Sequence, residues 1–513
     1  MSTLNGVGDI RPRPSWWPVV IAGGGFALGG ALAAFLAGLA AAGLDTDQPG
    51  RVTWAILLSG VFLTGCLCWW LVIERPKRLS VPRGAMAGVL TAVVCYPVIV
   101  GLAEWSRRDG GPLDSAGERV LYVLQASGFA LLTTGFGATL TLAILGMVGA
   151  FVLRPFYPAR PVPEESTLIR RLLNAATKAS LSLIVLLCVV FAGLTLWPLD
   201  AAGLARSRTQ VRPAMSHADA IAAFEAVQAK EASLPLNPRC VSKLLTHGER
   251  VAEAVVFLHG FTNCPAQYDE LAPELFARGY NIYVPLMPRH GEADQMTTAL
   301  AGLTAEELVA MTDGAIDLAQ GLGENVTVVG LSGGGTMTAW AGQYRVEADH
   351  TIAMAPFLGP YSVPPWANLA ATNLLLLLPN VMVPWDPSEP YGPPAMDYAY
   401  PRFATHAAAQ FLRLGEIVGA SARRNAPLAP GLGMLINEAD DAVSNVMAWR
   451  LVEAWQAHDR TVDVEVMSAD LGAIHDLIDP RQELANTALV YPLVIKMIER
   501  RPQSDGTSSP GGE

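Results

Sequence analysis

The sequence predicts an α/β domain, built as a mostly parallel sheet flanked by helices with a cap insertion, preceded by an all-α bundle of about five transmembrane helices. Long apolar runs without charge fill the first 200 residues. After residue 235, short apolar strands alternate with helix-period segments. The charge balance changes between the same parts: residues 1–199 carry 15 Lys and Arg against 10 Asp and Glu, whereas residues 200–513 carry 20 against 36. The two parts therefore face different surroundings.

The N-terminal part predicts a membrane domain over residues 1–200. An α-helix rises about 1.5 Å per residue, so even the shortest apolar run, about 20 residues, reaches roughly 30 Å and spans a hydrocarbon core. A signal peptide has an apolar core of only about 7–15 residues, so we expect the first run to remain in the protein. None of the runs contains Asp, Glu, Lys or Arg, and they cover residues 17–43, 53–73, 84–103, 120–153 and 180–199.

Basic residues predict the orientation of this domain in the plasma (inner) membrane. Lys and Arg gather before the first run, between the second and third, and between the fourth and fifth. The positive-inside rule makes these segments and the N-terminus cytoplasmic, so that residues after 200 lie outside the cytoplasm. Arg107 and Arg108, on a predicted outer loop, do not fit this rule. The spans hold no ionisable residue, which favours a membrane-lipid anchor over an ion pathway.

The C-terminal part predicts a connector and an amphipathic helix over residues 201–234, with Ser216 and Asp219 as its capping pair. An α/β domain follows over residues 235–501, and a disordered tail over residues 502–513. The predicted strands are residues 240–245, 254–258, 281–285, 326–329, 350–355, 431–437 and 462–467. The predicted helices are residues 266–278, 304–321, 336–344, 404–420, 446–458 and 484–500.

An insertion over residues 357–403 predicts a cap above the site. It is rich in proline and in aromatic residues, namely Trp366, Trp385, Tyr391, Tyr398 and Tyr400. Residues 374–378 are five consecutive leucines. They indicate either core packing or the apolar wall of an acyl pocket.

The pentapeptide Gly330-Leu331-Ser332-Gly333-Gly334 predicts a nucleophile. It follows a strand-like run and precedes a helix-compatible segment. A sharp turn between a strand and a helix projects the serine hydroxyl above the sheet, and side chains two positions to either side would collide there. Ser332 is therefore the expected catalytic nucleophile.

A histidine and an acid follow later strands in the order that such a nucleophile requires. His475 would take the proton from Ser332 and return it to the leaving group. Asp440 is the preferred acid because it follows the strand at 431–437 and can turn back toward the histidine. Asp441 and Glu438 remain alternatives.

Two main-chain amides are expected to bind the oxyanion. One belongs to Gly333, directly after the nucleophile, and the other to Phe261, in the loop after the strand at 254–258. His290, in the Pro288-Arg289-His290-Gly291 segment, is expected to stabilise a turn.

These segments resemble the α/β-hydrolase family, and within it serine carboxylesterases and monoacylglycerol-lipase-like enzymes. The resemblance rests on residues 258–262, 330–334 and 474–476 and covers about residues 235–500. It implies an α/β-hydrolase fold, with the catalytic serine, acid and histidine at Ser332, Asp440 and His475. It also implies ester or related acyl cleavage without a cofactor, and that His259 orders the loop at 258–262 rather than acting as a base. The N-terminal half lies outside the family pattern.

The sequence thus predicts a membrane-anchored serine hydrolase of lipid-like or amphiphilic carboxylic esters. Acyl transfer to a cell-envelope acceptor, or a non-catalytic sensor or transport protein, are the alternatives. The acidic domain argues against nucleic acid as a partner, and the Cys and His spacing does not predict a metal site. Cys240 and Cys264 form either a disulfide or two reduced, buried thiols.

Overall fold

The computed structural model describes residues 188–205, 213–386, 391–392 and 394–500. These residues do not include the first four predicted membrane runs, residues 180–187 of the fifth, or the tail at 502–513. Within the described residues, no helix is long and apolar enough to cross a membrane. The chain divides into two units, Met1–Val190 and Phe191–Glu513, and the second contains the sheet.

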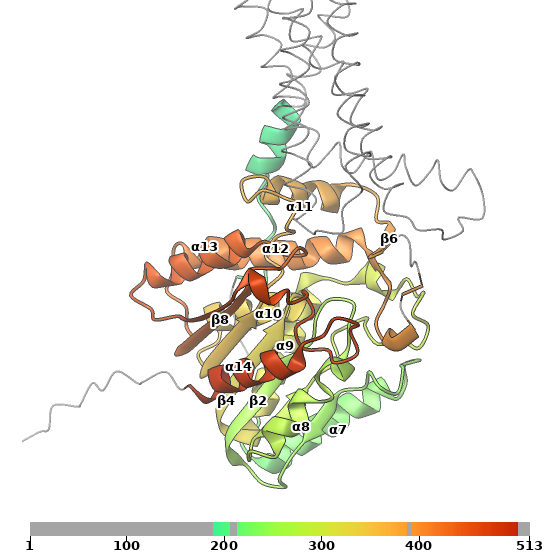
Figure 1. The fold of residues 1–513 in the computed structure, drawn as a ribbon, viewed down its shortest axis with the longest axis vertical. Helices are drawn as coiled ribbons and strands as arrows, with labels where there is room; N and C mark the ends of the chain where they lie inside the picture. Colours follow the sequence, from blue (N-terminus) through green and yellow to red (C-terminus); the bar gives the residue numbers. More distant parts are fainter. Residues whose placement is uncertain (1–187, 206–212, 387–390, 393, 501–513) are drawn as a thin grey trace, which may run out of the picture. The chain divides into compact units, whose positions relative to one another are not determined.

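A seven-stranded sheet forms the centre of the second unit (Figure 1). Its strand order is β1-β3-β2-β4-β5-β8-β9, and all neighbouring strands are parallel except the β1–β3 pair at one edge. The strands are β1 Lys243–Leu245, β2 Val251–Leu258, β3 Asn281–Val284, β4 Gly323–Leu331, β5 His350–Met354, β8 Gly431–Asn437 and β9 Asp463–Met467. Because the central strands run in parallel, their carboxyl ends meet at one edge of the sheet.

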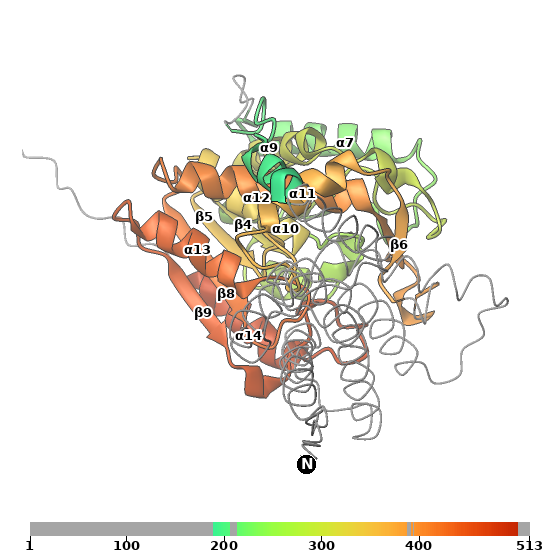
Figure 2. The ribbon, with the colours of Figure 1, turned by 90° about the horizontal axis from the view of Figure 1, so that it is seen from above.

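Helices cover both faces of the sheet. Alternate side chains of β2 enter two different cores: Val256 and Leu258 pack with α9, α10 and α12, whereas Val255 and Phe257 pack with α8 and α14. Figure 2 shows α10 and α12 on one side of the strands and α14 on the other. The helices are α7 His217–Glu231, α8 Leu271–Phe276, α9 Ala305–Leu322, α10 Gly333–Tyr344, α12 Thr405–Ala422, α13 Asn445–Gln456 and α14 Thr487–Glu499.

The predicted start of α7 is confirmed: the Asp219 amide donates to Ser216 Oγ, and Ser216 Oγ donates to the Asp219 carboxylate. The single helix predicted over residues 266–278 is wrong. Two shorter elements replace it, the 3-10 helix η5 Pro265–Tyr268 and α8. Pro273 lacks the N–H that a continuous helix would use at this point.

The cap contains elements that the sequence analysis did not predict. Helix α11, Asn368–Leu377, is followed by β6, Met382–Pro384, which pairs with β7, Arg402–Ala404, in an antiparallel hairpin. Short 3-10 helices complete the described fold: η6 Ala299–Gly302, η7 Pro394–Met396 and η8 Ala469–Leu471.

A disulfide joins Cys240 and Cys264, with 5.2 Å between their Cα atoms. It links the turn before β1 to the loop after β2. The strand predicted from residue 240 begins only at Lys243, because the Cys240 amide donates to Asn237 O in a turn. The Cys240 sulfur also lies 3.6 Å from Tyr398 O, so the disulfide contacts the cap as well.

Candidate active site

Ser332 lies at the sharp turn between β4 and α10. Its backbone angles, φ 56° and ψ −113°, fall in a region that residues with a side chain rarely adopt. Three main-chain hydrogen bonds hold it there: its amide donates to Met354 O, and its carbonyl accepts from the amides of Thr336 and Phe357. This strained geometry is typical of a nucleophile presented at the carboxyl end of a sheet.

The two flanking glycines are required by close backbone contacts. A Cβ on Gly334 would lie 2.0 Å from Leu258 O, and a Cβ on Gly330 would lie 2.3 Å from Gly334 O. Backbone atoms cannot move aside as a flexible side chain can. The turn therefore tolerates no side chain at either position, as the sequence predicts.

The structure brings His475 and Asp440 together. Asp440 Oδ2 accepts a hydrogen bond of 2.6 Å from His475 Nδ1, and Asp440 Oδ1 accepts from the amides of Ala442 and Val443. The Asp440 side chain is fully buried, whereas that of His475 is 24% exposed. This bond leaves Nε2 as the nitrogen that can accept and return a proton.

The two alternative acids lie differently. Asp441 and Glu438 are exposed, and Glu438 accepts a hydrogen bond from the Ala469 amide. Among the carboxylates of the described residues, Asp440 is the one that the structure records in a hydrogen bond with His475.

The environment of His475 raises its pKa. Burial by itself lowers the pKa of the imidazole, but the charge of Asp440 and its hydrogen bond outweigh burial. The charges of Asp476 and Asp441 act in the same direction, so the pKa of His475 lies above its ordinary value of 6.5. The fold thus stabilises the imidazolium that forms when a nucleophile loses its proton.

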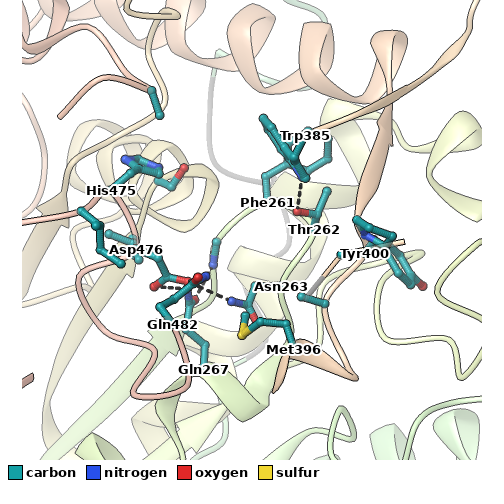
Figure 3. Close-up of a pocket in the computed structure, with 18 of the residues that line it drawn as sticks. Phe261, Thr262, Asn263, Gln267, Trp385, Met396, Tyr400, His475, Asp476 and Gln482 are labelled. Atoms are coloured by element: carbon teal, nitrogen blue, oxygen red, sulfur yellow. Dashed lines mark hydrogen bonds between the residues drawn. The ribbon is translucent and has the colours of Figure 1, made fainter. Parts of the chain in front are cut away.

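Ser332 and His475 line one cavity of about 510 Å³ (Figure 3). Its wall combines apolar groups with acidic ones, and none of the described residues that line it is a lysine or arginine. The apolar lining includes Phe261, Leu331, Phe357, Trp385, Met396, Val443 and Leu484. The acidic lining consists of Asp386, Asp476 and Glu483. None of the leucines at 374–378 lines this cavity, so their interpretation as the wall of this pocket is wrong.

The amides expected to bind an oxyanion lie next to each other. A Cβ built on Gly333 would lie 3.1 Å from the Phe261 amide nitrogen. Among the described residues, the structure records no main-chain acceptor for the amides of Phe261 and Gly333. Both residues are buried, and Phe261 lines the cavity with Ser332. Two adjacent N–H donors beside a strained serine can stabilise negative charge on a substrate oxygen.

Two buried histidines order the loop that carries Phe261. His259 Nε2 accepts from the Met287 amide, and its Nδ1 lies 2.9 Å from Gly260 O. His290 Nε2 accepts from the Thr262 amide, and its Nδ1 lies 2.9 Å from Pro288 O. Each ring therefore uses one nitrogen as acceptor and the other as donor, which requires the neutral form.

Burial lowers the pKa values of both rings. The pKa of His259 falls well below 6.5, because burial and the neighbouring His290 both oppose its charge. Burial lowers the pKa of His290 to about 4. Neutral rings at neutral pH fit the ordering roles that the sequence analysis assigned to them.

Gln267 connects this loop to the histidine loop. Its Oε1 accepts a hydrogen bond of 2.8 Å from the Gly260 amide, and its Nε2 donates one of 2.9 Å to Asp476 Oδ1. Gly260 precedes Phe261, and Asp476 follows His475. The sequence analysis missed Gln267, because no local pattern marks a glutamine whose partner is 209 positions away.

Further side chains that sequence reasoning missed fix the same two loops. Asn263 Nδ2 donates to both Asp476 Oδ2 and Asp479 Oδ2. Asn437, fully buried at the end of β8, donates to Ala473 O and Ile474 O just before His475. The histidine loop is therefore held from two directions.

The cap directly contacts the loop that carries Phe261. Trp385 Nε1 donates to Thr262 Oγ1 over 2.8 Å (Figure 3). The Tyr400 amide donates to Thr262 O over 2.8 Å. The Tyr398 hydroxyl donates to Asp479 Oδ2. Thr262 itself has a positive φ of 66°. The cap thus helps to hold a strained residue beside Phe261.

Comparisons with known proteins identify the domain. Residues 255–487 match the model of the alpha/beta hydrolase family, so this part of the chain is an alpha/beta hydrolase domain. No curated protein matches the chain.

Similar solved structures cover about half of the chain and most of their own length. A metagenome-derived lipolytic enzyme, from work on LipS and LipT, is 18% identical, with a TM-score of 0.41; the match covers 51% of this chain and 98% of that one. The monoacylglycerol lipase of Paleococcus ferrophilus is 20% identical, with a TM-score of 0.38; the match covers 50% of this chain and 97% of that one. A soluble variant of the monoglyceride lipase of Saccharomyces cerevisiae is 14% identical, with a TM-score of 0.36; the match covers 48% of this chain and 86% of that one.

Proposed function

We propose that the alpha/beta hydrolase domain at residues 255–487 is a serine esterase that cleaves neutral, lipid-like carboxylic esters. The observation that carries this proposal is the hydrogen bond between His475 and Asp440, in a cavity that Ser332 also lines. A polarised imidazole near a strained serine and two adjacent amides supplies the parts that acyl transfer requires.

In the proposed mechanism, Ser332 Oγ attacks the ester carbonyl carbon while His475 Nε2 takes the hydroxyl proton. Asp440 stabilises the imidazolium, and the amides of Gly333 and Phe261 bind the oxyanion. The alkoxide then leaves with the proton from His475, and an acyl group remains on Ser332. Water attacks this acyl-enzyme, gives its proton to His475 Nε2, and releases the acid as Ser332 Oγ regains a proton.

The cavity wall supports the substrate class. Its apolar side chains can bury an acyl chain at about 0.8 kcal/mol per methylene. Its described lining is acidic and holds no lysine or arginine, which disfavours a phosphate or carboxylate on the substrate. A neutral ester with an apolar chain fits both properties.

Labelling with a fluorophosphonate probe tests the nucleophile. The full-length protein should be labelled, and Ser332→Ala should not. Ser233→Ala, which changes an exposed serine just after α7, is the matched control and should be labelled like the wild type. Rates on esters of increasing acyl length should exceed the Ser332→Ala rate; equal background rates in both proteins would overturn the proposal.

We further propose that the N-terminal apolar runs anchor the protein in the plasma membrane and place the hydrolase domain outside the cytoplasm. The distribution of Lys and Arg around the runs supports this orientation. The Cys240–Cys264 disulfide supports it independently, because such bonds persist in oxidising compartments. Alkaline phosphatase fused after residue 513 should be active in cells. An inactive phosphatase fusion together with a fluorescent cytoplasmic reporter at the same position would contradict the proposed orientation.

A further inference from the structure

The cap exposes an apolar segment of unusual composition. Within residues 366–381, here called the apolar cap segment, Trp366 is 58% exposed, Leu377 75%, Leu378 41% and Val381 51%. Residues 351–385 contain no Asp, Glu, Lys, Arg or His, although the C-terminal part as a whole is strongly acidic. Single exposed leucines are ordinary, but several in a charge-free stretch indicate a surface that contacts an apolar partner.

Substrate binding in the cavity does not account for this exposure. None of the four exposed side chains lines the cavity around Ser332. Trp385, which follows the segment, does line it and is itself 51% exposed. The apolar cap segment is therefore followed, four residues later in the chain, by a residue of the cavity wall.

The segment is fixed to residues 191–197, at the end of the last predicted membrane run. The rings of Phe191 and Trp366 meet edge to face, with 5.4 Å between centroids. Asn373 is 8% exposed, and its Nδ2 donates to the carbonyls of Leu194 and Trp197 over 2.8 and 3.0 Å. Figures 1 and 2 both show the helix at 191–196 beside α11.

We propose that the apolar cap segment contacts the lipid bilayer and lies in its interfacial region. The apolar run at 180–199 ends where these contacts are made, so a membrane anchor there would hold α11 at the bilayer surface. Trp197, 69% exposed, lies in the same place, and tryptophans gather at membrane interfaces. The absence of charge removes the cost of bringing charged groups into lipid.

The proposal rests on the proposed membrane anchor and deepens the proposed function. A neutral ester dissolved in the bilayer would reach the cavity beside Trp385 without first entering bulk water. The segment would then determine from which phase the substrate is taken, while Ser332, His475 and Asp440 carry out the chemistry.

An environment-sensitive label tests the contact in the full-length protein. Cys66, Cys68, Cys95 and Cys188 are replaced by serine, and the disulfide-bonded Cys240 and Cys264 are kept. A nitrobenzoxadiazole label is attached to Leu377→Cys or, as the matched control, to Val346→Cys. Val346 is 57% exposed and lies before β5, at the opposite edge of the sheet from the catalytic residues.

In phosphatidylcholine liposomes, doxyl-labelled lipids should quench the label at position 377 strongly and the label at 346 weakly. Equal, weak quenching at both positions would overturn the proposal. A blue-shifted label at 377 that doxyl lipid does not quench would indicate a protein partner or a second copy instead, and would also overturn it.

A kinetic comparison adds a second readout. Leu377→Glu combined with Leu378→Glu should lower the rate on a long-chain ester embedded in liposomes about tenfold or more, since charged side chains oppose the contact with lipid. The rate on a soluble acetyl ester should not change. Equal loss on both esters would contradict the proposed role. If no ester is cleaved at all, the esterase proposal fails while the quenching result still stands.

Discussion

Gln267 Nε2 donates a hydrogen bond of 2.9 Å to Asp476 Oδ1, and Gln267 thereby joins the loop that carries Phe261 to the loop that carries His475. The other end of the same amide accepts the Gly260 N–H. One side chain thus sets the spacing between two loops that, in the proposed mechanism, act on the same carbonyl group.

The first prediction concerns this bridge. Gln267→Ala should lower kcat/KM about ten- to hundredfold, since a displacement of about 1 Å in a catalytic group can cost that much. Gln482→Ala is the matched control, because Gln482 also donates to Asp476 but has no recorded contact with Gly260. Steady-state kinetics should show the larger loss for Gln267→Ala, mainly in kcat. Equal losses of kcat/KM in both variants would mean that the hydrogen bonds to Asp476, and not the link to Gly260, support activity.

The second prediction separates two neighbouring acids. Asp440→Asn should lower kcat by about 10⁴, as loss of the orienting aspartate does in serine proteases with this constellation. Asp441→Asn should change kcat by less than about threefold, because Asp441 is exposed and acts on His475 only through charge. The two variants carry the same chemical change one residue apart. Similar losses in both would refute the assignment of Asp440.

The third prediction is the pH dependence of activity. The proposed base must be neutral to take a proton, and its pKa is raised by Asp440 above 6.5. The rate should therefore be low in acid and increase with pH through a pKa above 6.5. A pH profile of kcat/KM on a neutral ester gives this value directly. An acid limb below 6.5 would show that the rate-controlling group is not His475 in this environment.

The fourth prediction concerns stability in acid. The pKa of His290 is about 4 in the folded protein and about 6.5 in the unfolded chain, so the unfolded state binds more protons between these values. This group should therefore destabilise the fold as pH falls from 6.5 towards 4, by about 3 kcal/mol at most. His290→Gln, which keeps one donor and one acceptor but does not titrate, should show a smaller decrease in Tm over this range. An unchanged decrease would exclude His290 as its source.

The fifth prediction concerns the disulfide. Replacing Cys240 and Cys264 together by serine should lower the free energy of unfolding by about 3 kcal/mol, the value expected for a closed loop of this length. Chemical denaturation of both proteins measures the difference. Dithiothreitol should shift the wild type towards the variant and leave the variant unchanged. A wild type that already unfolds like the double variant would contradict the stabilising role.

Much of the fold was readable from the sequence because its signals are local. Apolar strands with β-branched residues, and helices with apolar periodicity, depend on neighbours within a few positions. The glycines at 330 and 334 are also local signals, because the geometry of one turn requires both of them. Helix α11 escaped prediction because its run of leucines has no polar side that would mark a periodic face.

The sequence by itself determined the alternation of strands and helices, the sharp turn at Ser332 and the chain order of the predicted catalytic residues, because covalent neighbours impose these features. Only the tertiary structure decided that Asp440 rather than Asp441 bonds to His475. It also decided that Gln267 joins two loops and that Asn373 fixes the cap to residues 191–197. These contacts depend on how the chain turns after each strand and join residues up to 209 positions apart. Close packing of the surrounding core brings such distant residues together.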